Sequence, residues 1–186
     1  MSKGTLLVLS GPSGVGKTTI AKKLRETPGI VRVMTTTTRP KRPAEVDGRD
    51  YRFLARAAFE AAVATGEFLE WAEIDGNLYG TPKAEIAREL SAGKAVLVDI
   101  DTQGAKSVRQ LGLPAFFVFI APPDMAELRR RLEGRKTEAP DAVKMRLERA
   151  EREMAQKDSY DAVVVNVTVE GAVGEILAEA RKRNLI

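Results

Sequence analysis

The 186-residue chain carries 30 lysines and arginines against 26 aspartates and glutamates, and 44% of its residues are hydrophobic. This composition predicts one soluble globular domain with at most small attached subdomains, and it excludes a disordered, fibrous or polybasic nucleic-acid-binding chain. The chain has no cysteine and no histidine, so it offers no disulfide, no thiolate metal site and no histidine general base.

The first expected element is a strand over residues 5–10, a short apolar run that ends at glycine. The residues before it are too few and wrongly flanked for a signal peptide, and no stretch approaches the roughly 20 apolar residues of a membrane helix. We therefore expect a cytoplasmic protein with no membrane or nucleic-acid partner. The choice between a monomer and a homo-oligomer stays open.

A complete phosphate-binding motif follows this strand. Residues 11–18 read GPSGVGKT, match G-x-x-x-x-G-K-[ST] at every specified position, and precede a helix expected over 17–26. The loop N–H groups can hold phosphate oxygens, Lys17 can reach the β- and γ-phosphates of ATP, and the Thr18 hydroxyl can bind Mg²⁺ directly. The alternative is a glycine-rich turn with a helix-capping threonine. The predicted ATP-binding residues of the loop are Gly11, Ser13, Gly14, Val15, Gly16, Lys17, Thr18 and Thr19.

The segment 35–80 breaks the simple rhythm of strands and helices. It contains the stretch TTTTRPKRP, the alternating pieces YRFL and FLEWAEID, and one helical stretch near 56–64, which together predict an inserted subdomain with antiparallel strands. Arg39 and Arg42 can each hold a phosphate through two hydrogen bonds, and the hydroxyls of Tyr51 and Tyr79 can add donors. A solvated basic loop is the alternative.

Three later apolar runs, at 95–100, 115–121 and 162–167, predict further buried strands, each followed by a helix-like stretch. Strands that alternate with helices indicate an α/β fold with a parallel sheet flanked by helices. Asp99, near the end of the first run, is a candidate for the magnesium shell, acting through water; a helix cap or a polar turn residue is the alternative.

Residues 125–156 are charged and helical, with a break at GRKT (134–137) and Pro140, which predicts two helices joined by an exposed, arginine-bearing loop. Several charged residues here have the spacing of solvated helix faces with opposite charges. They are Arg129, Arg130, Arg149, Arg152, Glu148, Glu151 and Glu153.

Together these motifs resemble the guanylate kinase family from about Thr5 to Asn166. The resemblance rests on TLLVLSGPSGVGKTT, TTTTRPKRPAEVDGRDYRF, EFLEWAEIDGNLYGT, VLVDIDTQGAKSV, FFVFIAPP and RRRLEGR, in this order and spacing. It implies a P-loop NTPase core with a parallel sheet, at about 1–34, 82–124 and 158–186. It further implies a mixed α+β GMP-binding subdomain at about 35–81, a helical lid at about 125–157, and closure on binding both substrates.

The resemblance also assigns the acceptor site. It implies that the GMP phosphate is held by Arg39, Arg42, Tyr51 and Tyr79, and that guanine is surrounded by Thr35, Glu70, Thr81 and Asp101. Guanine presents an N1–H and a 2-amino donor side by side, which carboxylates accept, whereas adenine has an acceptor at N1. Glu70 is therefore the predicted specificity residue, with a surface strand glutamate as the alternative.

The lid residues follow from the same resemblance. It implies that Arg131, Arg135 and Arg146 reach the ATP phosphates and the transferring phosphoryl group, and that Asn166 lies near adenine. The predicted catalytic set is Lys17, Arg39, Arg42, Arg131, Arg135 and Arg146. The predicted reaction is Mg²⁺-assisted in-line transfer from ATP, the co-substrate, to GMP, with dGMP as a second acceptor.

Two rival functions remain. The first is a nucleoside monophosphate kinase of other base specificity, against which Glu70 and Asp101 argue. The second is a non-catalytic guanylate kinase-like protein-binding module, a class that has lost ATP-site residues. The presence of Lys17, Thr18 and the lid arginines argues against that second reading.

Overall fold

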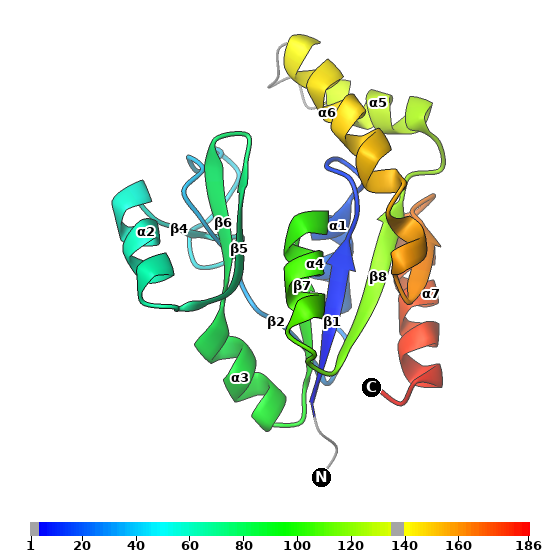
Figure 1. The fold of residues 1–186 in the computed structure, drawn as a ribbon. Coiled ribbons are helices and arrows are strands. Elements are labelled where there is room, and N and C mark those ends of the chain that lie inside the picture. Colours follow the sequence, from blue (N-terminus) through cyan, green and yellow to red (C-terminus); the bar gives the residue numbers. More distant parts are fainter. Residues whose placement is uncertain (1–3, 135–139) are drawn as a thin grey trace.

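The computed structural model describes residues 4–134 and 140–186, and its elements form a core sheet, a smaller second sheet and a pair of helices above the core (Figure 1). Among residues 4–134 and 140–186, no helix is both long enough and apolar enough to cross a membrane.

The core is a five-stranded sheet in the order β2-β7-β1-β8-β9, and its neighbouring strands pair in parallel. The strands are β1 (Thr5–Ser10), β2 (Ile30–Arg32), β7 (Ala95–Asp99), β8 (Ala115–Ala121) and β9 (Ala162–Val165). The central strands are almost completely buried, which explains their continuous apolar sequences, because helices cover both faces of a parallel sheet. The predicted α/β fold with a parallel sheet flanked by helices is confirmed.

Helices cover the two faces of this sheet in pairs. On one face Leu7 and Leu9 of β1 belong to a buried cluster with α1 and α7, whereas Leu6 and Val8 share a second cluster with α3 and α4. These helices are α1 (Lys17–Leu24), α3 (Lys83–Ser91), α4 (Thr102–Gln110) and α7 (Val169–Lys182). The central strands are thereby shielded from water, and the loops at the carboxyl ends of the strands are left to form a site.

The second sheet has the order β4-β3-β6-β5 and is folded entirely from the segment that interrupts the core. Its elements are β3 (Thr36–Thr37), β4 (Arg52–Phe53), α2 (Arg56–Ala64), β5 (Phe68–Ile74) and β6 (Asn77–Pro82). The predicted antiparallel strands are present, as β3 with β6 and β5 with β6, but β3 and β4 pair in parallel. Phe59 of α2 stacks on Phe68 with ring centroids 4.5 Å apart, which holds the helix on the sheet.

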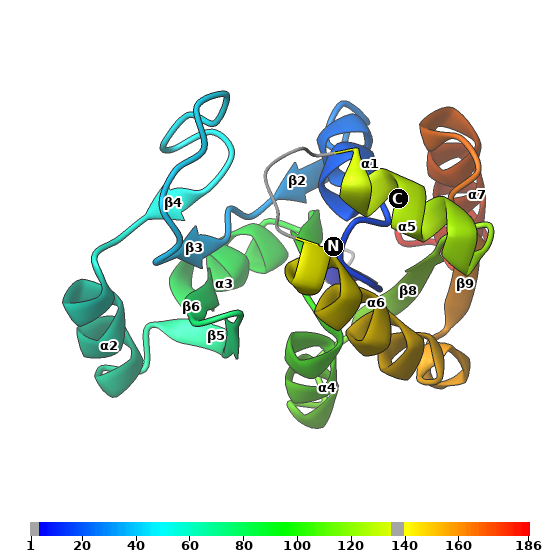
Figure 2. The same cartoon turned by 90° about the horizontal axis from the view of Figure 1, so that it is seen from above.

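The paired helices α5 (Met125–Glu133) and α6 (Pro140–Met154) lie above the carboxyl end of β1 (Figures 1 and 2). They pack through a small apolar cluster that includes Leu128, Leu132 and Leu147. The two helices predicted for this segment are therefore present. A 3₁₀ turn, η1 (Lys157–Ser159), connects α6 to β9.

Candidate active site

A cavity of about 260 Å³ lies between the P-loop, the second sheet and α6. The predicted site residues that line it are Gly11, Ser13, Gly14, Gly16, Lys17, Thr18, Thr19, Thr35, Arg39, Arg42, Tyr51, Glu70, Tyr79, Asp99, Asp101 and Arg146. Residues from segments far apart in the chain therefore share one concave site.

The phosphate-binding loop curls between β1 and α1. Gly16 precedes the first residue of α1 with φ 102°, a left-handed conformation that favours glycine. The Lys17 ammonium donates to the carbonyl oxygens of Gly11, at 2.5 Å, and Pro12, at 3.0 Å. The Lys17 ammonium is thus held beside the loop, at the place where phosphate oxygens would bind.

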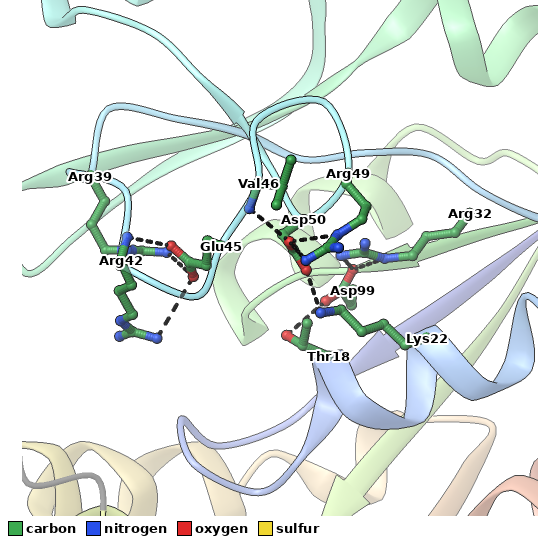
Figure 3. Close-up of polar contacts among 10 residues, drawn as sticks. All are labelled: Thr18, Lys22, Arg32, Arg39, Arg42, Glu45, Val46, Arg49, Asp50 and Asp99. Atoms are coloured by element: carbon green, nitrogen blue, oxygen red, sulfur yellow. Dashed lines mark hydrogen bonds and ion pairs between the residues drawn. The ribbon is translucent and has the colours of Figure 1, made fainter.

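Asp99 lies at the end of β7 and is held from two sides (Figure 3). Nε and Nη2 of Arg32 donate to its Oδ1 at 3.0 and 2.9 Å, and the Thr18 hydroxyl donates to its Oδ2 at 3.2 Å. Both side chains of the Arg32–Asp99 pair are only 4% exposed. The helix-cap alternative for Asp99 is wrong, because Asp101 is the residue that caps α4, accepting from the Gly104 N–H at 2.8 Å.

Arg39 and Arg42 converge on the carboxylate of Glu45 (Figure 3). Arg39 Nη2 lies 2.7 Å from Glu45 Oε1, and the backbone N–H of Arg42 donates to Oε2 at 2.8 Å. The Arg39 guanidinium also lies over the Tyr51 ring, 5.4 Å from its centroid. Glu45 therefore orients the Arg39 guanidinium and fixes the backbone at Arg42 before any phosphate arrives.

Tyr51 brings its hydroxyl to the same cavity. Burial, with the nearby charge of Asp99, raises the pKa of Tyr51 to about 12. The phenol stays protonated at neutral pH, so it can donate a hydrogen bond to an anion.

Asp50, next to Tyr51, anchors this loop on α1 (Figure 3). Its buried carboxylate pairs with the Lys22 ammonium, accepts from the Val46 N–H at 2.9 Å, and accepts from Arg49 at 3.1 Å. The hydrogen bond from Lys22, followed by that from Val46, holds the pKa of Asp50 well below its usual range.

We predict that Asp50→Asn lowers the free energy of unfolding by about 2–3 kcal/mol. The substitution removes the negative charge that balances the Lys22 ammonium, and it weakens the hydrogen bonds from Val46 and Arg49. A carboxyl with a lowered folded pKa stabilises the protein above its unfolded pKa of about 3.9, and the contribution is lost as the pH falls through the folded value. Urea unfolding at pH 7 and below pH 3 should therefore show that the loss of stability in Asp50→Asn becomes smaller in acid.

Glu26→Gln, in the exposed pair with Lys23, is the control and should change stability by less than about 1 kcal/mol. An Asp50→Asn variant as stable as the unmodified protein at pH 7 would contradict the proposal that Asp50 anchors this loop on α1.

Glu70 lies on the cavity side of β5. A register shift between Phe68 and Glu70 precedes a regular alternation in which Glu70, Ala72 and Ile74 line the cavity, while Trp71 is 47% exposed on the other side. The Thr81 hydroxyl on β6 donates to Glu70 Oε1 at 2.5 Å, and Glu70 is 6% exposed. The alternative of a surface strand glutamate is therefore wrong.

The electrostatic state of Glu70 follows from its position. Burial is the main cause that raises the pKa of Glu70 to about 7; the charge of Asp101 adds to this rise, and the hydrogen bond from Thr81 opposes it. The carboxyl is thus close to its titration midpoint at neutral pH, and a ligand that donates hydrogen bonds would favour its charged form.

Two arginines of α6 reach across to the hairpin between β5 and β6. Both Nη atoms of Arg149 donate to the Asp75 carboxylate, at 3.0 and 3.1 Å, and Arg146 Nη2 lies 3.3 Å from Asp75 Oδ2. Arg146 also lies 3.5 Å from the Ser13 hydroxyl of the P-loop. The prediction that Arg149 is a solvated surface residue is wrong, because its side chain is only 24% exposed, pairs with Asp75 and lines the cavity.

Glu153 was also predicted to lie on a solvated face, and this is wrong too. It is 8% exposed and lines the cavity one further turn along α6. Burial raises the pKa of Glu153, while the charges of Lys17 and Arg149 oppose that shift. The spacing 146, 149, 153 was the signal in the sequence that these three residues share one helix face.

The remaining predicted residues do not line this cavity or lie outside the described part of the chain. Arg131 donates to the carbonyl oxygens of Asn166, at 2.9 Å, and Val15, at 3.3 Å, and the Asn166 amide donates to the Val15 carbonyl at 2.7 Å. Val15 itself is fully buried. Thr81 sits behind Glu70, and Arg135 falls outside the described residues.

Comparison with known proteins agrees with this geometry. The family model described as "Guanylate kinase" matches residues 3–181. The chain belongs to the guanylate kinase family. The resemblance stated from the sequence motifs is thereby confirmed.

Relatives in this family match the chain over most of its length. A guanylate kinase of Gloeobacter violaceus is 51% identical over 90% of this chain and 82% of the relative, and one of Thermobifida fusca is 48% identical over 93% and 89%. The crystal structure of guanylate kinase from Anaplasma phagocytophilum superposes with a TM-score of 0.84 at 36% identity, covering 100% of this chain and 88% of that one.

Several cavity or supporting residues of this family member were not predicted as functional: Arg32, Glu45, Asp50, Asp75, Arg149 and Glu153. For most of them the decisive partner is remote, as in the Arg32–Asp99 and Arg149–Asp75 pairs. Glu45 is the exception, because it lies three residues after Arg42. An acidic residue so close to two arginines could have been predicted from the sequence to pair with them.

Proposed function

We propose that this protein transfers the γ-phosphoryl group of ATP to GMP, giving ADP and GDP. The observation that carries the proposal is the buried carboxylate of Glu70, which lines the same cavity as a complete P-loop. Membership of the guanylate kinase family supports the same activity.

Base recognition rests on the pairing of donors and acceptors. Glu70 and Asp101 both line the cavity and offer acceptor oxygens, which match the adjacent N1–H and 2-amino donors of guanine. Adenine would place an acceptor opposite a buried carboxylate, and a polar site rejects such a ligand by a factor on the order of 10⁴. These carboxylates therefore favour GMP over the alternative of another base specificity.

Phosphoryl transfer requires alignment and positive charge. Arg39, Arg42 and the tyrosine hydroxyls would hold the GMP phosphate opposite Lys17 and the P-loop. A bond then forms between a GMP phosphate oxygen and the γ-phosphorus as the bond to the β-γ bridging oxygen of ATP breaks. The attacking oxygen is already an anion, so no general base is needed, and the cationic side chains stabilise the charge of the transition state. The retained P-loop lysine and threonine disfavour the non-catalytic binding module.

The oxygens at the P-loop suit Mg²⁺, which typically takes one or two protein ligands and completes its shell with phosphates and water. Thr18 would bind it directly and Asp99 through water, since their oxygens lie 3.2 Å apart beside the loop. When bound, the ion would neutralise charge on the β- and γ-phosphates. The division into core, GMP-binding subdomain and lid, the acceptance of dGMP and a cytoplasmic location belong to the same proposal.

The raised pKa of Glu70 predicts a pH effect on GMP binding. Glu70 has a pKa of about 7, so its protonation in the free protein should raise KM for GMP about tenfold from pH 8 to pH 6. The reason is that only the ionised carboxylate accepts hydrogen bonds from both guanine donors. Initial rates at saturating ATP would measure it. The GMP phosphate titrates near pH 6 as well, so Glu70→Gln serves as the control that keeps only the phosphate contribution. Equal pH profiles for the two proteins would refute the role of Glu70 ionisation.

A coupled assay of ADP formation tests the proposed function, with MgATP and, separately, GMP, AMP, CMP, UMP and dTMP as acceptors. Efficient turnover with GMP alone is expected. Preference for another nucleotide would overturn the acceptor assignment, and binding of GMP without turnover would support the binding module instead.

A further inference from the structure

Gly104 lies in the first turn of α4 and faces the two carboxylates assigned to the base. A Cβ atom built at this position would lie 2.5 Å from Glu70 Oε2, 3.1 Å from Glu70 Cδ and 3.2 Å from Asp101 Oδ1. The 2.5 Å contact is far shorter than an ordinary van der Waals distance, and the other two are tight. Any side chain at position 104 would therefore collide with the Glu70 carboxylate.

The same residue also fixes Asp101. The backbone N–H of Gly104 donates to Asp101 Oδ1 at 2.8 Å, which makes Asp101 the N-cap of α4. On the opposite side of Glu70, the Thr81 hydroxyl donates to Oε1. The Glu70 carboxylate thus lies between Thr81 and the helix turn that begins at Asp101.

We propose that Gly104 is a specificity-determining residue, because its missing side chain lets the Glu70 and Asp101 carboxylates converge on the acceptor base. This inference rests on the proposed GMP kinase activity and deepens it. Gly104 acts through Glu70 and is a positioning residue: the smallest side chain would push the Glu70 carboxylate off its place by a fraction of an ångström to about 1 Å, which is enough to spoil hydrogen-bond geometry with a fixed base.

The effect on recognition can be separated from any effect on folding. Gly104 has no positive φ and lies within a helix, where alanine is intrinsically favoured over glycine. The nearest atom to the added methyl group is the far end of the Glu70 side chain, which can rotate away. Alanine at position 104 should therefore leave the fold intact and disturb the carboxylate.

Gly104→Ala is the test, and Gly174→Ala is the matched control. Gly174 also lies inside a helix, α7, and a Cβ there meets nothing within 4 Å. Gly104→Ala should lower kcat/KM for GMP by about tenfold or more, mainly through KM for GMP, and leave KM for ATP within about twofold. Gly174→Ala should leave both constants unchanged, and neither variant should lower Tm.

A double-mutant cycle with Glu70→Ala shows whether the effect passes through Glu70. Once the Glu70 carboxylate is absent, Gly104→Ala should cause less than about a twofold further change in KM for GMP. An equal loss in both backgrounds, or a Gly104→Ala variant within twofold of the unmodified protein, would overturn the inference. Absence of GMP turnover in the unmodified protein would instead overturn the proposed function.

Discussion

Replacing Arg42 with alanine should lower kcat for GMP phosphorylation by about 10²-fold or more, in line with the effects of arginines on phosphoryl transfer. The Arg42 side chain lines the cavity and is 46% exposed, with its guanidinium 4.0 Å from Glu45. A group so exposed contributes little to the fold, so the variant should unfold at nearly the same temperature. Steady-state rates at saturating ATP and GMP, with thermal unfolding alongside, measure both effects.

Lys41→Ala is the matched control for Arg42, because it removes the neighbouring exposed cation and leaves the predicted clamp intact. Arg42→Lys should recover only part of the loss, since an ammonium supplies charge without the planar fork of a guanidinium. Turnover of purified Arg42→Ala close to that of the unmodified protein would remove Arg42 from the catalytic set. We expect the same loss for Arg135→Ala, at a position outside the described residues.

The second large effect is expected at Glu70. Glu70→Gln should lower kcat/KM for GMP by about 10²-fold or more, because the amide presents a donor where guanine needs an acceptor, and a buried polar mismatch is costly. Thr81 already donates to Oε1 at 2.5 Å, so the amide oxygen would be retained there and the NH₂ group turned toward the base. Kinetics with GMP and AMP as competing acceptors would measure the loss and any relaxation of specificity.

Glu73→Gln is the control on the same strand. Glu73 faces away from the cavity, where its side chain is 49% exposed and lies 3.7 Å from Arg56, so the same substitution there should leave GMP kinetics within about twofold. Equal kinetics in the two variants would mean that Glu70 does not read the base.

Prediction from the sequence worked best where the signal is local. The P-loop lies in eight consecutive residues between a strand and a helix, and the apolar runs of β1 and β8 are continuous. The strand β2 carried no such signal, because Ile30–Arg32 is too short to show a period, yet it supplies the Arg32 that holds Asp99.

The interpretation of charged residues was less successful. The charged, helical composition of residues 125–156 correctly predicted two helices, but it did not show which charged side chains meet another part of the molecule. Arg149 and Glu153 were assigned to solvent because each has opposite charges nearby in sequence, whereas the folded chain places Asp75 opposite Arg149.

The parallel α/β core, the phosphate-binding loop and the family could all be predicted from the chain alone, because contiguous residues encode a strand, a loop that binds phosphate and a helix. The folded arrangement was needed to see that Lys22 binds Asp50, that Arg149 reaches Asp75, and that Gly104 leaves space for Glu70. The physical reason is that burial and pairing depend on neighbours in space. Residues dozens of positions apart set the dielectric surroundings and hydrogen bonds of each carboxylate, and no local pattern records them.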